Sequence, residues 1–149
     1  QIDHDENAVS IHVRRGDYLE PKYWKTTGCV CQLPYYLNAI AEMNKRISQP
    51  SYYVFSDDIA WVKENLPLPK AFFIDWNKGA ESWQDMMLMS RCRHHIICNS
   101  TFSWWGAWLN PRKNKTVIMP ERWFRHCETP DICPDKWIKV PINQPDSIQ

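Results

Sequence analysis

Short segments rich in β-branched and aromatic residues alternate along this chain with segments of helical periodicity, and this alternation constrains the fold most. The segments typical of strands lie at residues 8–14, 51–56, 71–74, 95–98 and 116–119. The segments typical of helices lie at residues 34–49, 59–66, 82–89 and 102–109. Strands joined through helices pair in parallel, because each crossover returns the chain to the same edge of the sheet. The sequence therefore predicts an α/β fold with helices on both faces of a parallel sheet.

Length and charge narrow the class of protein further. The chain has 149 residues, enough for one hydrophobic core, so we expect a single domain over residues 1–149. Its 18 basic and 17 acidic residues leave a net charge of +1, and no broad positive field points to nucleic acid as a partner. No apolar run is long enough to span a bilayer. Residues 19–33 lack periodicity, and we expect an irregular loop there.

The first predicted strand ends in the charged motif His12-Val13-Arg14-Arg15-Gly16-Asp17-Tyr18. Two guanidiniums at the carboxyl end of a strand suit a diphosphate, since Arg offers planar, bidentate donors and keeps its charge. Open α/β sheets bind ligands at that edge, and Gly16 lets the backbone turn sharply there. Two other interpretations remain open at this point: a solvated or salt-bridged Arg pair, and an adhesive Arg-Gly-Asp loop.

Two more polar loops follow predicted strands and should meet the Arg pair at the same edge. They are Ser56-Asp57-Asp58 and Asn99-Ser100-Thr101-Phe102-Ser103. The second loop leads into a helix, where free backbone N–H groups favour an anion and hydroxyls can add donors. The convergence of three such loops predicts a nucleotide-diphosphate site.

Each candidate in these loops also has a structural interpretation. Asp58 and Ser103 can cap the helices that follow them. Ser82 can open a helix as its N-cap, with Asp85 three residues later as the acidic member of a capping box. These interpretations are the stronger ones for each residue alone, and only the convergence of the loops favours a ligand.

The six cysteines leave two interpretations open. The spacing of Cys29 and Cys31 is one residue tighter than the usual zinc-ligand spacing, and the spacing of Cys127 and Cys133 is wider. The alternative interpretation is a zinc site formed by Cys29, Cys31, Cys127, Cys133 and His126. We favour reduced, buried or half-buried thiols in a cytoplasmic protein, with Cys92 and Cys98 in the core.

Three blocks together carry a resemblance to a known family. HVRRGDY at residues 12–18, YYVFSDD at 52–58 and NSTFSWWGAWLNP at 99–111 resemble the α-1,2-fucosyltransferases, glycosyltransferase family 11. The resemblance extends from residue 9 to about residue 140. Members of that family are about twice as long, and their HVRRGDY block falls near the middle. The resemblance thus implies the C-terminal, Rossmann-like GDP-fucose-binding half of a two-domain, GT-B-like glycosyltransferase, without the N-terminal half that helps form the acceptor cleft.

The resemblance implies roles around the phosphates. Arg14 corresponds to the catalytic arginine that holds the β-phosphate and stabilises charge as GDP departs. Arg15 is expected to brace the loop by pairing with Asp17 or Asp57. His12, on the same strand face as Arg14, is placed to hydrogen-bond the nucleotide.

The remaining implied roles concern the loop hydroxyls and the nucleoside. Ser103, with Ser100 and Thr101, corresponds to the loop that donates to the phosphates. Asp85 corresponds to an acid that accepts from the N1–H and 2-amino group of guanine, which would select GDP over ADP or UDP. Asp58 corresponds to an acidic pair near the nucleoside.

The implied reaction is inverting transfer of L-fucose from GDP-β-L-fucose, a co-substrate, to the 2-OH of a terminal galactose on a glycan. The resemblance implies neither a metal nor another cofactor. The acceptor would bind through the missing half. A bacterial-type parent would be cytoplasmic, and a peripheral association with the inner membrane is compatible with this expectation.

Two non-catalytic alternatives remain. Nine Trp residues could stack on sugars in a carbohydrate-binding module, although Trp104, Trp105 and Trp108 fit a short helix packed into the core. A nucleotide-binding regulatory domain without transfer chemistry is the second alternative. A helix-poor circular dichroism spectrum would favour the first, because such modules are mostly β-sandwiches.

Overall fold

Residues 1–143, the part of the 149-residue chain that the computed structural model describes, form a six-stranded parallel sheet. The strands lie side by side in the order β3-β2-β1-β4-β5-β6. Their bounds are Ala8–Val13 (β1), Ser51–Ser56 (β2), Ala71–Ile74 (β3), His94–Ile96 (β4), Val117–Pro120 (β5) and Ile138–Val140 (β6). This is the strand order of the Rossmann fold, and it reverses between β1 and β4. The predicted parallel, Rossmann-like α/β fold is therefore confirmed.

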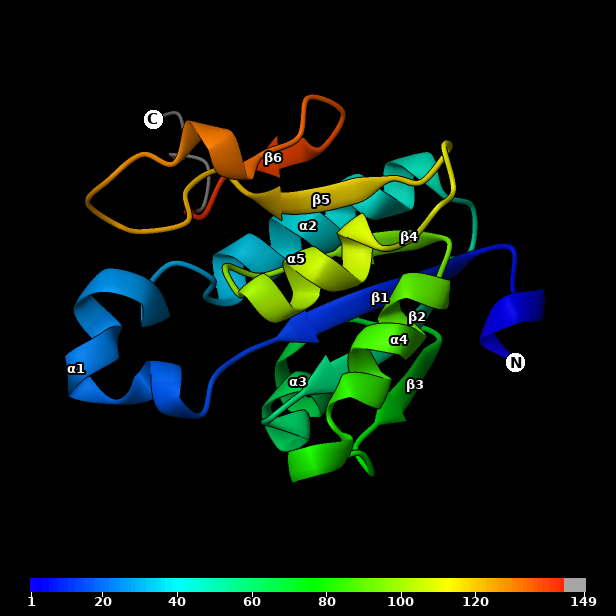
Figure 1. The fold of residues 1–149 in the computed structure, drawn as a ribbon, viewed down its shortest axis with the longest axis horizontal. Coiled ribbons are helices and arrows are strands. Elements are labelled where there is room, and N and C mark those ends of the chain that lie inside the picture. The colour runs from blue at the N-terminus through cyan, green and yellow to red at the C-terminus, as the bar shows by residue number, and fades with distance from the viewer. Residues whose placement is uncertain (144–149) are drawn as a thin grey trace.

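Helices cover both faces of this sheet, as predicted (Figure 1). On one face lie α2 (Leu33–Arg46) and α3 (Ile59–Asn65), and on the other lie α4 (Trp83–Arg91) and α5 (Thr101–Trp108). A short helix, α1 (Pro21–Tyr23), lies beyond the carboxyl end of β1 (Figure 1). No helix in the described part of the chain is both long and apolar enough to cross a bilayer.

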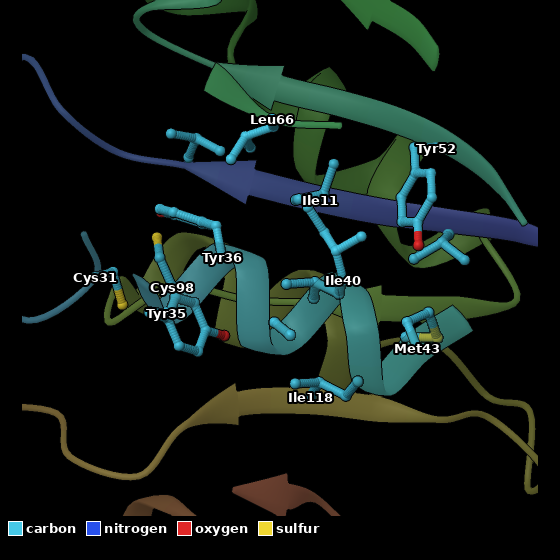
Figure 2. Packing of buried hydrophobic residues seen from close by; sticks show 14 of the residues in the cluster. Ile11, Cys31, Tyr35, Tyr36, Ile40, Met43, Tyr52, Leu66, Cys98 and Ile118 are labelled. Carbon is cyan, nitrogen blue, oxygen red and sulfur yellow. The ribbon is translucent and has the colours of Figure 1, made fainter. Parts of the chain in front are cut away.

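The main core lies between β1 and α2 (Figure 2). Ile11 is fully buried there against apolar side chains of α2. Two buried tyrosines of that helix also fix the strand ends: Tyr35 donates its hydroxyl to the carbonyl of Ile97, and Tyr36 donates to the carbonyl of His12 at 3.3 Å. Burial raises the pKa of both phenols well above its usual value, so both remain donors. The core therefore holds the carboxyl ends of the two central strands.

Residues 19–33 are not the irregular loop that the sequence predicted. A 3-10 turn (Asp17–Leu19), α1 and a π-turn (Trp24–Gly28) follow one another there. Long-range contacts set this conformation: the Tyr18 hydroxyl donates to the carbonyl of Asn99 at 3.0 Å. Gly28 packs so closely that a Cβ would lie 1.8 Å from the Tyr18 carbonyl oxygen.

Other predictions hold in part. The short strand β6 was not predicted, and β4 begins and ends earlier than residues 95–98. Of the three tryptophans expected to pack into the core, only Trp104 does so, donating Nε1–H to the Ile132 carbonyl at 2.8 Å. Trp105 and Trp108 are about half exposed.

The capping predictions divide in the same way. Asp58 is the N-cap of α3, accepting from the Trp61 N–H at 3.1 Å. Ser82 occupies the N-cap position of α4, as predicted. The capping box is wrong, because Ser82 makes no side-chain cap bond and the Asp85 carboxylate bonds Asn77. The prediction of Ser103 as a cap is also wrong: Ser100 occupies the cap position of α5, and Ser103 lies inside the helix.

We predict that acid destabilises the fold partly through His95, which is fully buried between Ser10 Oγ and Asn110 Nδ2, each at 2.8 Å. Burial lowers the pKa of His95 to about 3. Below its ordinary pKa near 6.5 the unfolded chain takes up a proton that the folded chain refuses, so stability falls as pH drops from about 6.5 towards 3. Urea unfolding at several pH values gives the slope of the free energy of unfolding against pH. His95→Gln should reduce this slope by up to about 1.4 kcal/mol per pH unit.

The matched control is His4→Gln, which removes an exposed imidazole. This variant should show the same slope as the wild-type chain. A His95→Gln variant with the wild-type slope would contradict the assignment.

Candidate functional site at the sheet's carboxyl edge

The three polar loops meet at one edge of the sheet, as the sequence predicted. The Arg15 backbone N–H, after β1, donates to Asp57 Oδ1, after β2, at 2.8 Å. Tyr18, also after β1, reaches Asn99 after β4 through the hydrogen bond described above. Since β1 and β4 flank the point where the strand order reverses, this edge is where a Rossmann-like sheet opens a crevice for a ligand.

A pocket of about 460 Å³ lies at this edge, within the size range of small-molecule sites. Its walls come from the ends of β1, β2 and β3 and from the first turns of α4 and α5. Among its lining residues are His12, Arg14, Asp57, Asn77, Asp85 and Phe102. A more apolar hollow of about 410 Å³ lies beside α4 and has no Arg pair.

Arg14 is the cation of this pocket that two carboxylates orient. Its Nε and Nη2 donate to the Asp17 carboxylate at 2.9 and 3.0 Å, and Nε lies 3.6 Å from Asp57 Oδ2. The hydrogen bond from Arg14 lowers the pKa of Asp17 and raises that of the guanidinium, so both stay charged. Nη1 bonds none of residues 1–143, and this leaves donors for a ligand in the pocket.

Arg15 braces the loop, as the resemblance implied, but through a different partner. Its Nε lies 3.2 Å from Asp58 Oδ2, and its guanidinium stacks on the Trp61 ring at 4.1 Å. Asp17 is unavailable to Arg15 because it holds Arg14, and Asp57 accepts from the Arg15 backbone instead. With 14% of its side chain exposed and no part in the pocket lining, Arg15 is a structural residue.

Gly16 is needed for space and not for a left-handed turn. Its φ of −20° is negative, so the sharp turn expected there has no positive φ. A Cβ on Gly16 would lie 2.6 Å from Asp57 Oδ2. The missing side chain therefore lets the first two loops approach each other.

Asp85 faces the pocket from the first turn of α4 and accepts from Asn77 Nδ2 at 2.7 Å through Oδ1. Burial raises the pKa of this carboxyl above its usual value. Asn77 was missed from the sequence because an Asn two residues before Gly79 is typical of an ordinary turn. The available signal was its position in a fourth loop at the same edge, after β3.

The Ser/Thr loop lies differently from the expectation. Ser100 and Ser103 are buried, with 6% and 2% of their surface exposed, and the Ser103 hydroxyl donates to the Ser100 carbonyl at 3.3 Å. Thr101 is exposed, and Phe102 is the residue of this loop that lines the pocket. Of the predicted site residues, the pocket therefore brings together three: His12, Arg14 and Asp85. The predicted site residues that do not line it are Arg15, Asp17, Asp58, Ser100, Thr101 and Ser103.

The alternative zinc site is not assembled in the described part of the chain. No three His, Cys, Asp or Glu side chains within residues 1–143 are grouped so as to hold a metal ion. All six thiols are free, and Cys92 and Cys98 are fully buried in the core, as predicted.

Comparisons with known proteins agree with this geometry. The family described as glycosyl transferase family 11 matches residues 2–140. An alpha-1,2-colitosyltransferase from Escherichia coli is 38% identical over 138 residues, covering 90% of this chain and 48% of that protein. The O-antigen biosynthesis glycosyltransferase WbnK from Escherichia coli is 36% identical over 135 residues, covering 90% and 45%. A galactoside alpha-(1,2)-fucosyltransferase 1 from Ateles belzebuth is 34% identical over 111 residues, covering 72% and 30%.

The fold and the polar carboxyl edge define a Rossmann-like α/β protein with a pocket at the switch point of its sheet. More narrowly, the chain belongs to glycosyl transferase family 11. It spans about half the length of the bacterial relatives that it matches.

We predict that Arg15→Ala lowers the free energy of unfolding by about 1–2 kcal/mol, because it removes the stacking on Trp61 and the ion pair with Asp58. Thermal or urea unfolding measures this. Arg46→Ala, which removes an exposed ion pair with Glu42 inside α2, is the control and should cost less than about 0.5 kcal/mol. Equal losses in the two variants would contradict the bracing role.

Proposed function

We propose that this chain binds the GDP part of GDP-β-L-fucose and forms the donor half of an inverting α-1,2-fucosyltransferase. The observation that carries the proposal is the position of Arg14, which lines the pocket at the switch point of a family 11 chain. The acceptor is the 2-OH of a terminal galactose, held by a second half of the enzyme. The relative named as an alpha-1,2-colitosyltransferase makes colitose the second candidate for the transferred sugar.

Arg14 supplies the main catalytic effect in this proposal. As the bond from the sugar to the β-phosphate breaks, negative charge builds on the leaving diphosphate, and the guanidinium donors stabilise it. The Asp17 carboxylate fixes the direction of these donors before the donor substrate binds. The carboxylates of Asp17, Asp57 and Asp58 offset the positive charge of the two guanidiniums. Hydrogen bonds therefore contribute more to GDP binding than the net charge of the site does, and we expect a modest affinity for GDP.

Asp85 and the loop after β3 read the base. An ionised Asp85 accepts from the N1–H and the 2-amino group of guanine, a donor pair that adenine and uracil lack. Asn77 holds the carboxylate in place, and partial burial raises the pKa of this carboxyl above its usual value.

Asp85→Asn should weaken GDP binding about 10- to 100-fold and leave ADP binding almost unchanged, because the amide turns donors towards the donors of guanine. Isothermal titration calorimetry with GDP, ADP and UDP measures these affinities. With wild-type protein, GDP affinity should fall as pH drops towards the raised pKa of Asp85, and Asp85→Asn should lack that dependence. An equal loss of affinity for GDP, ADP and UDP would show that Asp85 only supports the helix.

The transfer activity is tested in a polypeptide that combines this chain with the acceptor half. Arg14→Ala should lower kcat for transfer from GDP-fucose to a galactose-terminated oligosaccharide by about 10²-fold or more. Arg15→Ala is the matched control and should leave kcat near the wild-type value at a temperature where it stays folded. The isolated chain should transfer nothing, because orientation of the acceptor can supply roughly 7–11 kcal/mol. Transfer by the isolated chain, or full turnover by Arg14→Ala, would overturn the proposal.

A further inference from the structure

Cys98 is a buried thiol that contacts His12, one of the residues that line the candidate site. It lies just after β4 and has no exposed surface (Figure 2). Its Sγ is 3.3 Å from Nδ1 of His12 and 3.8 Å from the Ser103 hydroxyl. One sulfur atom therefore joins the ends of β1 and β4 beneath the pocket.

The protons in this cluster can be placed from the burial and the distances. Burial raises the pKa of the Cys98 thiol to about 12 and lowers the pKa of His12 to about 3, so at neutral pH the thiol keeps its hydrogen and the imidazole is uncharged. The Ser103 hydroxyl gives its own hydrogen to the Ser100 carbonyl. Its oxygen is a more distant acceptor than the imidazole nitrogen. The thiol hydrogen therefore points at His12 Nδ1, which must accept it.

The other ring nitrogen of His12 then carries the proton. Nε2 bonds none of residues 1–143, and it is not among their fully buried unpaired atoms. Since His12 lines the pocket, this nitrogen is open to a ligand. His12 and Arg14 lie two residues apart on one strand face, about 7 Å along the strand, so their donors can reach neighbouring oxygens of one diphosphate.

We infer that Cys98 is a positioning residue, which holds His12 in the tautomer whose Nε2–H donates to a phosphate oxygen of the nucleotide. This inference rests on the proposed function, since it concerns the same pocket. In the opposite tautomer Nε2 would turn a lone pair towards the phosphate, and the contact would become repulsive. The thiol thus determines whether His12 helps or opposes Arg14.

The test compares Cys98→Ala and Cys98→Ser with Cys92→Ala. Cys92 is the matched control, because it is equally buried but donates to the Leu88 carbonyl, outside the pocket. Long-range ¹⁵N–¹H correlation spectra report which nitrogen of His12 carries the proton. Calorimetric titration with GDP reports the affinity.

The wild-type spectrum should show a protonated Nε2 and a bare Nδ1, and the Nε2 signal should shift on addition of GDP or of inorganic pyrophosphate. Cys98→Ala should lose the tautomer preference and bind GDP about 3- to 10-fold more weakly. Cys98→Ser keeps a donor at this position and should restore both. Cys92→Ala should lower stability while leaving the tautomer and the affinity unchanged.

The outcomes separate the inference from the proposed function. Wild-type protein that binds GDP with the proton on Nδ1, or a Cys98→Ala variant with wild-type tautomer and affinity, would overturn the inference alone. Wild-type protein that does not bind GDP would overturn the proposed function and the phosphate contact with it. The wild-type spectrum decides the tautomer even if Cys98→Ala does not fold.

Discussion

The alternation of side chains along β1 is the constraint on which the rest of the structure depends. Val9, Ile11 and Val13 are fully buried on the α2 side of the sheet. His12 and Arg14 consequently point to the opposite side, where the pocket lies. A shift of one residue in the pairing of β1 would place a charged side chain in the core and a valine in the pocket. The packing of the core therefore fixes the direction of the candidate catalytic arginine.

Within the site, different residues bind the ligand and hold the binding residues in position. Each arginine of the motif is held by its own carboxylate, and only Arg14 faces the pocket. Arg15, stacked on Trp61, ties the end of β1 to α3. We infer a similar task for the buried Cys98, which contacts His12 from the end of β4. A rigid surrounding of this kind keeps donors in place before the substrate arrives, which is what stabilisation of a leaving group requires.

The sequence predicted the parts of the structure that depend on local pattern. Five of the six strands and the four main helices follow from hydrophobic periodicity, and the meeting of the loops follows from parallel pairing. The strand β6 has only two apolar residues, Ile138 and Val140, around an exposed lysine, so it shows no clear pattern. The turns after β1 are set by the distant contact between Tyr18 and Asn99.

Within the site, the residue types indicated the chemistry but not the orientation of each side chain. The Ser/Thr loop looked like a set of donors for phosphate. Ser103 turned out to bond its own helix, and Phe102 faces the pocket instead. Asn77 resembles any turn residue until the fold places it beside Asp85. Such placements depend on tertiary packing, which a motif does not encode.

We propose that GDP binds in the pocket that Arg14 and Asp85 both line. The most direct test is titration of the ¹⁵N-labelled chain with GDP, followed through its backbone amide signals. We expect a dissociation constant of about 10–100 µM and shifts concentrated at Arg14, Asn77 and Asp85. Shifts concentrated around Trp108 and Lys136, at the far end of α5, or no shifts at millimolar GDP, would contradict it.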